Sequence, residues 1–173
     1  TVAPGHAFSW DGASRLTAID SVVLSYNGAD NILTRTASGV ITRFYYNHAV
    51  EMNPIMAERN ETANATQRYY VWTPEGRLLY IINAASGNTV SHVHTDRVGS
   101  VLALTSAAGA VTDAYAYSPY GVLLARTGAN PQPFLYIGAF GGRYEPAANL
   151  YQMRARYYDP NGARFLSRDP VWP

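Results

Sequence analysis

The chain has 173 residues, of which 47% are hydrophobic, so it has the length and apolar content of one ordinary folded domain. Its 13 basic and 12 acidic residues give a formal net charge of +1 without a long run of either sign, which argues against a nucleic-acid or anionic-membrane partner. The absence of cysteine excludes disulfides, thiolate zinc sites and cysteine nucleophiles, and no apolar run approaches the ~20 residues that a membrane helix needs.

A turn motif recurs along the chain, about every 20 residues, at the end of extended apolar stretches. An aromatic residue or His is followed by a polar residue and, after a spacer, by Gly, as in Trp72-Thr73-Pro74-Glu75-Gly76. The polar side chain can accept hydrogen bonds from backbone amides that follow it, and Gly supplies a positive φ. We expect the anchors to stack on one face of a sheet; they are Trp10, Tyr26, Tyr46, Trp72, His94, Tyr117 and Tyr158.

Between these turns polar and apolar residues alternate, as over 113–117, which predicts strands with two distinct faces. The fold class is therefore all-β, with successive antiparallel hairpins and little helix. The alternative is an ordinary β-sandwich whose hairpins have similar turns. The step from Tyr117 to Tyr158 is about two repeat units long. This predicts a further strand near Tyr136 whose turn residues no longer match the repeat pattern.

We interpret residues 1–173 as a single domain, with repeats over 1–46 and 69–133 and a closing segment over 134–173. Residues 47–68 are rich in Asn, Glu and Ala and lengthen one step of the repeat. We predict a polar insertion there, as a loop or a short helix, although Pro54 disfavours a helix.

The stretches 92–124 and 134–170 resemble the YD-repeat (Rhs-type) proteins. The motif that carries this resemblance is Leu150-Tyr151-Gln152-Met153-Arg154-Ala155-Arg156-Tyr157-Tyr158-Asp159-Pro160, followed by Gly162, Arg164-Phe165-Leu166-Ser167 and Asp169-Pro170. The resemblance implies a strip of hairpins that winds into a spiral and, in full-length relatives, closes into a shell around a C-terminal effector such as a toxin. It also implies a secreted or cell-surface protein without a cofactor.

This chain has too few hairpins to close such a shell alone, so we expect a fragment or processed piece of a larger shell. The expected partners are a downstream C-terminal effector, other segments of the same polypeptide, or further copies that associate through strand edges. The last possibility describes a second hypothesis, an extracellular structural or adhesive protein that forms filaments.

The resemblance further implies aspartyl self-cleavage, for which Asp159 and Asp169 are the matching residues. Two carboxylates that share a proton can activate water against a nearby peptide bond. The sequence departs from the family pattern, because Trp172 stands where relatives have Gly. A structural interpretation is that Asp159 is a turn acceptor and Asp169 a cap, with neighbouring arginines as partners. We therefore expect a scaffold rather than an enzyme.

Two further patterns are present. His92 and His94 lie on one face of a predicted strand near Asp96, a spacing that occurs in metal sites, but ring stacking in the repeat explains His94 and we expect no metal. Asn60-Glu61-Thr62 and Asn64-Ala65-Thr66 match the glycosylation acceptor pattern, so Asn60 and Asn64 are candidate modification sites.

Overall fold

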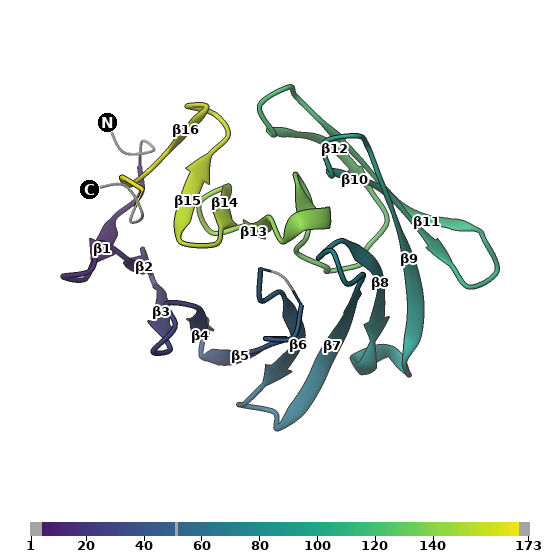
Figure 1. Cartoon of the computed structure of the whole chain (residues 1–173), viewed down its shortest axis with the longest axis horizontal. Helices are drawn as coiled ribbons and strands as arrows, with labels where there is room; N and C mark the ends of the chain where they lie inside the picture. The colour runs from purple at the N-terminus through teal and green to yellow at the C-terminus, as the bar shows by residue number, and fades with distance from the viewer. Residues whose placement is uncertain (1–4, 51, 170–173) are drawn as a thin grey trace.

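The computed structural model describes residues 5–50 and 52–169, which form two antiparallel sheets (Figure 1). The large sheet has twelve strands in sequence order, each paired with the next. They are β1 (Phe8–Trp10), β2 (Leu16–Ile19), β3 (Val22–Tyr26), β4 (Ile32–Ala37), β5 (Val40–Tyr46), β6 (Ile55–Asn60), β7 (Ala65–Trp72), β8 (Leu78–Asn83), β9 (Thr89–Thr95), β10 (Val101–Ser106), β11 (Val111–Tyr117) and β12 (Leu123–Thr127).

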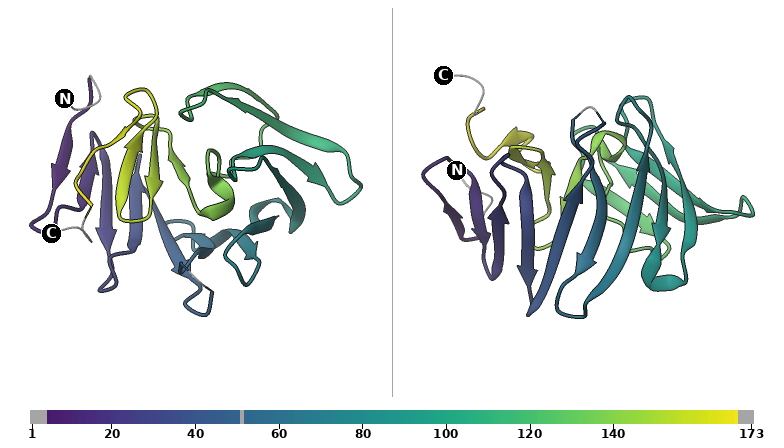
Figure 2. Two further views of the ribbon diagram at one scale, coloured as in Figure 1. Left: turned by 45° about the horizontal axis from the view of Figure 1, so that its top comes forward. Right: turned by 60° about the horizontal axis from the view of Figure 1, so that its bottom comes forward.

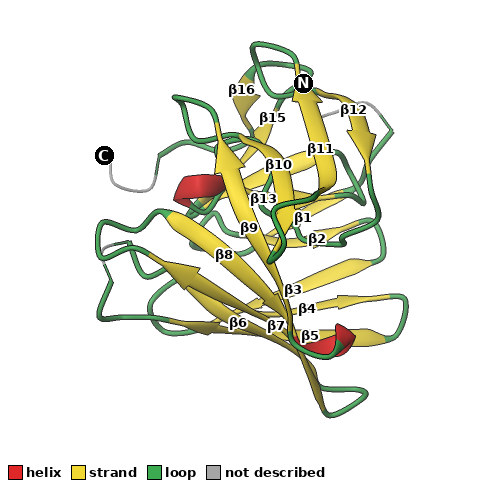
Figure 3. Ribbon diagram, turned by 90° about the vertical axis from the view of Figure 1, so that its right-hand side faces the viewer, coloured by secondary structure: helices red, strands yellow, loops and turns green. Residues whose placement is uncertain are grey.

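The small sheet has four strands, which lie inside the curve of the large one (Figure 2). They are β13 (Arg143–Glu145), β14 (Leu150–Met153), β15 (Arg156–Asp159) and β16 (Arg164–Phe165). We call β1–β12 the wall and β13–β16 the inner sheet. The only helical segments in the described part of the chain are two 3-10 turns, Ala84–Ser86 and Gly138–Phe140 (red in Figure 3). None of its helices is long and apolar enough to cross a membrane.

The prediction of an all-β strip of successive hairpins is confirmed. The sandwich alternative does not hold, because the twelve strands form one continuous sheet that stays open. The end of the predicted closing segment, residues 170–173, lies outside the described residues.

The turns have the geometry that their residues predict. In the turn after β9, Asp96 Oδ1 accepts the backbone N–H of Val98 at 3.0 Å and that of Ser100 at 2.7 Å. Gly99 has a φ of 90° and its N–H donates to the carbonyl of Asp96. Because the acceptor and the positive φ are both local, short sequence patterns determine where the wall reverses.

The predicted loop or short helix over 47–68 is wrong. The chain turns until the N–H of Asn47 meets the carbonyl of Pro54, and β6 begins at the next residue. The polarity has another cause, because Glu58 of β6 is buried and forms an ion pair with Arg68 of β7 at 2.7 Å. Glu58 and Arg68 thus pair on the buried face of the β6–β7 hairpin, at the point where its register shifts.

The predicted strand near Tyr136 is also wrong. Phe134 makes a single β-bridge to Arg143, and the chain then turns through Ile137, at a φ of 54°, into the Gly138–Phe140 3-10 turn. This segment does not extend the wall. It carries the chain from the wall's last strand into the concave side, where the inner sheet begins.

The core lies between the two sheets. One cluster joins strands β2–β8 of the wall to Phe134, Leu150 and Tyr157. A second joins Val101, Leu104 and Tyr115 of the wall to Leu135 and Tyr151. Burial of these side chains is the main stabilising contribution available to a protein without disulfides.

Candidate functional site

The aromatic anchors connect successive hairpins of the wall. Four of them lie at an irregularity in the strand register and donate to the carbonyl of the first residue of the preceding strand. The bonds run from Tyr26 to Leu16 at 2.7 Å, from Tyr46 to Ile32 at 2.7 Å, from Trp72 to Ile55 at 2.8 Å and from Tyr117 to Val101 at 2.8 Å. Burial raises the pKa of Tyr26 to about 12, so its hydroxyl remains a donor.

Three of the anchor rings contact Phe134 or Tyr136, which belong to residues 134–165; we call these residues the inner segment, and it includes the inner sheet. Trp72 lies 5.3 Å from Phe134, measured between ring centroids. Tyr136 lies 6.0 Å from Tyr117 and 6.3 Å from Tyr158. Trp72 and Tyr117 therefore join the hairpins by polar bonds and also join the wall to the inner segment by ring contacts.

The anchor position of the repeat around residue 95 is Thr95, one residue after the predicted anchor His94. Asp96 begins the turn, so Thr95 takes the place that an aromatic residue takes elsewhere. His94 is exposed and forms a 2.9 Å hydrogen bond with Thr105 Oγ1. Arg77 donates to Thr95 Oγ1 at 3.2 Å and so supplies a contact at this position.

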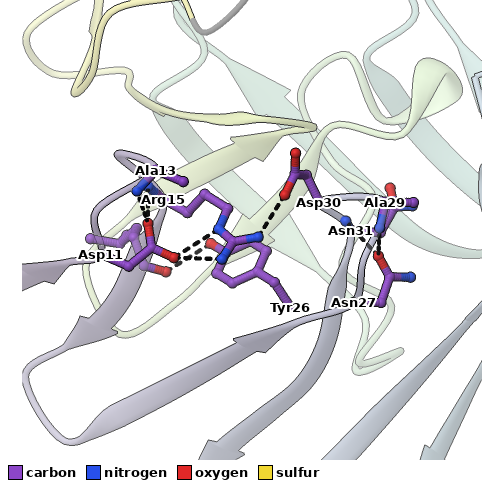
Figure 4. A network of polar contacts seen from close by, with 9 residues as sticks. Asp11, Ala13, Arg15, Tyr26, Asn27, Ala29, Asp30 and Asn31 are labelled. Atoms are coloured by element: carbon purple, nitrogen blue, oxygen red, sulfur yellow. Dashed lines mark hydrogen bonds and ion pairs between the residues drawn. The ribbon is translucent and has the colours of Figure 1, made fainter.

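A polar network joins the β1–β2 turn of the wall to the β3–β4 turn (Figure 4). Arg15 donates to Asp11 at 2.8 Å and to Asp30 at 2.5 Å, and its guanidinium lies 4.8 Å from the ring centroid of Tyr26. Hydrogen bonds from the backbone and side chain of Arg15 lower the pKa of Asp11. Asn27 accepts the N–H groups of its own turn, as Asp11 does. This end of the wall is thus fixed by local bonds around one arginine.

Three tyrosine hydroxyls attach the inner segment to one turn of the wall. They donate to the consecutive carbonyls of the β11–β12 turn, from Tyr136 to Pro119 at 3.1 Å, from Tyr158 to Tyr120 at 3.0 Å and from Tyr151 to Gly121 at 2.9 Å. The neighbouring turn contributes backbone bonds, from Val101 to Leu135 and from Ala139 to Gly99, both 2.9 Å. The β11–β12 turn and the β9–β10 turn of the wall therefore hold the inner segment by hydrogen bonds.

A buried ion pair connects the other side of the inner sheet to the wall. Arg35 of β4 donates from Nε and Nη2 to the two carboxylate oxygens of Glu145 on β13, both at 2.7 Å. Glu145 is fully buried. Burial raises the pKa of Glu145, but the hydrogen bonds from Arg35 and the charges of Arg143 and Arg35 outweigh it, so its pKa lies below the ordinary value. The carboxylate is charged and paired at neutral pH.

The two candidate catalytic carboxylates make different contacts. Asp159 is buried and its Oδ1 accepts the N–H of Asn161 at 2.9 Å, in the geometry of a turn acceptor. Asp169 is partly exposed and forms an ion pair with Arg156 at 2.8 Å. Each carboxylate has a contact that suits a structural role, and their catalytic role stays a prediction.

The predicted sequons lie at the tip of the β6–β7 hairpin. Asn64 is exposed, whereas Asn60 is partly buried and accepts the N–H of Ala63 at 2.9 Å. Their glycosylation stays a prediction. Among residues 5–50 and 52–169, no group of three or more His, Cys, Asp or Glu side chains is arranged to hold a metal.

Sequence reasoning missed the contacts that hold the inner sheet. Arg35 and Glu145 are 110 positions apart, and no local pattern pairs them. The tyrosine acceptors are backbone carbonyls, which any residue provides, so the sequence had no signal for them.

Comparisons with known proteins agree with this architecture. A family model for the Teneurin YD-shell matches residues 11–172. The chain is 23% identical over 170 residues to the tRNA3(Ser)-specific nuclease WapA of Bacillus spizizenii, covering 94% of the chain and 7% of that protein. It is 32% identical over 118 residues to salivary gland surface protein 1 of Aedes aegypti, covering 68% of the chain and 3% of that protein.

A solved structure supports the fold. The crystal structure of TcdB2-TccC3 matches 99% of the chain, and 9% of its own, with a TM-score of 0.70 and 20% identity. The chain thus spans only a small part of the length of the proteins that it resembles.

Proposed function

The chain belongs to the Teneurin YD-shell family, and from this premise we propose that it is a structural section of a larger, secreted or surface-exposed shell that encloses an effector downstream in the same polypeptide. The wall supplies the curved barrier. The inner segment, which includes the inner sheet, is fixed to the wall by Arg35 and by three tyrosines and supports the concave side.

The observation that carries this proposal is the open wall. Among the described residues, β1 pairs only with β2 and β12 only with β11, so each outer strand has one unpaired edge. Unpaired edges invite association with other strands. The small share of each relative that the chain covers favours strands of the same polypeptide as those partners.

Protease protection tests enclosure. In the full-length polypeptide we expect the segment downstream of this chain to resist a protease until the shell is unfolded by denaturant. The same segment expressed alone is the control and should be digested at once. Digestion at equal rates in the two samples would refute enclosure.

A second candidate, suggested by the same open edges, is a self-assembling extracellular filament. Electron microscopy of the purified 173-residue chain distinguishes it. Ordered filaments would favour this function, and dispersed particles would favour the shell.

A third candidate is self-cleavage through Asp159 and Asp169. We expect no cleavage in a chain that continues past Pro173, because the contacts with Asn161 and Arg156 suit structural roles. Cleavage of the wild type that both Asp159→Asn and Asp169→Asn abolish would establish the catalytic function.

A further inference from the structure

The turn between β15 and β16 contains one of the two Asn-Gly pairs of the chain, Asn161-Gly162. The other pair, Asn27-Gly28, lies in the turn between β3 and β4. An asparagine that precedes glycine can lose ammonia, because the backbone nitrogen of the glycine can reach the side-chain carbonyl carbon without obstruction from a Cβ. The contacts of each pair determine whether it can react in the folded protein.

Asp159 is the reason why residue 162 is glycine. Its Oδ1 accepts the N–H of Asn161 at 2.9 Å, which directs the buried carboxylate toward the turn. A Cβ on residue 162 would lie 2.9 Å from Asp159 Oδ2 and 3.2 Å from Arg164 Nε. This close approach leaves no room for a side chain, so the turn requires Gly directly after Asn161.

The reacting groups of the Asn161-Gly162 pair are accessible and unrestrained. Both residues are exposed, and the carboxamide of Asn161 makes no hydrogen bond to another described residue. The N–H of Gly162 has no acceptor in the described part of the chain either. The carboxamide can therefore rotate toward this nitrogen without breaking a contact, and solvent can reach the N–H to remove its proton.

The carboxamide of Asn27, in contrast, is held by its own turn. Its Oδ1 accepts the N–H of Ala29 at 2.9 Å and that of Asn31 at 3.0 Å (Figure 4). Asn27 is also partly buried. Attack by the nitrogen of Gly28 requires these hydrogen bonds to break first, so the fold protects this asparagine.

We propose that Asn161 is a site of spontaneous deamidation and that its conversion loosens β16. The nitrogen of Gly162 loses its proton to solvent and forms a bond to Cγ of Asn161. The bond from Cγ to the side-chain nitrogen then breaks, and this nitrogen takes up a proton from solvent and leaves as ammonia, so that a succinimide ring remains. Water opens the ring at either carbonyl, which gives aspartate or isoaspartate. Both products add a negative charge near the carboxylate of Asp159, and isoaspartate also adds a methylene group to the backbone.

The strand β16 is weakly held, and so it is sensitive to this change. In the described part of the chain it pairs only with β15, over two residue pairs, of which Asp159 with Arg164 closes the turn. An extra backbone atom in a tight turn disturbs the register of the strands that it joins, and two like charges close together repel each other. Conversion should therefore separate β16 from β15 and expose the chain after Arg164.

Peptide mapping after incubation tests the site. The folded 173-residue chain is kept in mildly alkaline buffer and then digested with trypsin, which cuts after arginine and so separates residues 157–164 from residues 16–35. We expect the peptide 157–164 to gain the mass difference between a hydroxyl and an amino group, and to match synthetic peptides with aspartate or isoaspartate at position 161. The peptide 16–35 should stay unchanged at Asn27. In a sample unfolded in urea both asparagines should convert.

The matched control is Asn161→Gln, which keeps the carboxamide but closes the ring much more slowly because of its extra methylene group. This variant should stay unchanged at position 161. Brief trypsin treatment of the incubated, folded samples should cut the wild type after Arg164 several-fold faster than the variant. An unchanged Asn161 in the folded chain, or conversion of Asn27 at the same rate, would overturn the proposed site. Conversion of Asn161 without faster cleavage would overturn the effect on β16.

Discussion

Replacement of Glu145 by Gln tests the connection between the wall and the inner sheet. The substitution keeps the size of the side chain but removes its charge, which leaves the guanidinium of Arg35 without a counter-charge. Removal of one member of a buried pair costs about 3–5 kcal/mol. Because the Arg35 side chain is still 17% exposed, we expect the lower end, about 3 kcal/mol of unfolding free energy. For a chain of this length that lowers the Tm by about 6–12 °C.

Urea unfolding followed by circular dichroism measures this loss. The control is Glu61→Gln, whose carboxylate pairs with Arg43 at 3.1 Å while 32% exposed. Exposed pairs contribute about 0–1 kcal/mol, so this variant should unfold close to the wild type. Equal small losses in both variants would refute the conclusion that the Arg35 pair fixes the inner sheet.

The pH dependence is a second readout of the same pair. The folded pKa of Glu145 lies below its ordinary value, so its contribution to stability is fully present above the unfolded pKa of about 4.3. That contribution is lost as the pH falls through the lower folded value. The stability difference between the wild type and Glu145→Gln should therefore narrow on acidification below about pH 4. A difference that stays constant from pH 7 to pH 3 would contradict this assignment.

Two further substitutions test the contacts between the inner segment and the β11–β12 turn of the wall, again by urea unfolding. Tyr151→Phe removes the hydroxyl that donates to Gly121 and should cost about 1 kcal/mol, whereas Tyr69→Phe, at an exposed ring, should cost almost nothing; equal costs would refute the role of the hydroxyl. Gly109→Ala and Gly121→Ala both place Ala at a positive φ, near 81° and 91°, at a cost of about 1 kcal/mol. Gly121→Ala should cost about 1–3 kcal/mol more, because its Cβ would lie 2.5 Å from the ring of Tyr136, while the space around Gly109 is open; equal losses would show that the ring yields freely.

The hairpins of the wall could be predicted because their causes are local. Asp96 accepts two N–H groups of its own turn, and Gly99 supplies the positive φ three residues later. Both residue types can be identified in a single sequence, so the order of strands and turns follows from it.

The segment 47–68 shows where composition misleads. Its polar residues suggested an exposed insertion, but Glu58 and Arg68 face each other inside the wall and neutralise each other there. A buried ion pair and a solvated surface have the same composition, and only the register of β6 with β7 distinguishes them.

The site could be predicted only in part. The motif around Tyr158 indicated the family, but its contact is the carbonyl of Tyr120, which depends on how the inner sheet enters the curve of the wall. The bond between Arg35 and Glu145 depends on the same long-range geometry. Such contacts follow from the tertiary arrangement, and periodicity along the chain does not determine it.

Electron cryomicroscopy of the full-length polypeptide tests the central claim most directly. We predict that β1 and β12 each pair with a strand from another segment of that polypeptide, in a closed wall with the effector inside. A filament in which these edges pair with other copies of the chain, or a wall whose two edges stay unpaired, would contradict the account.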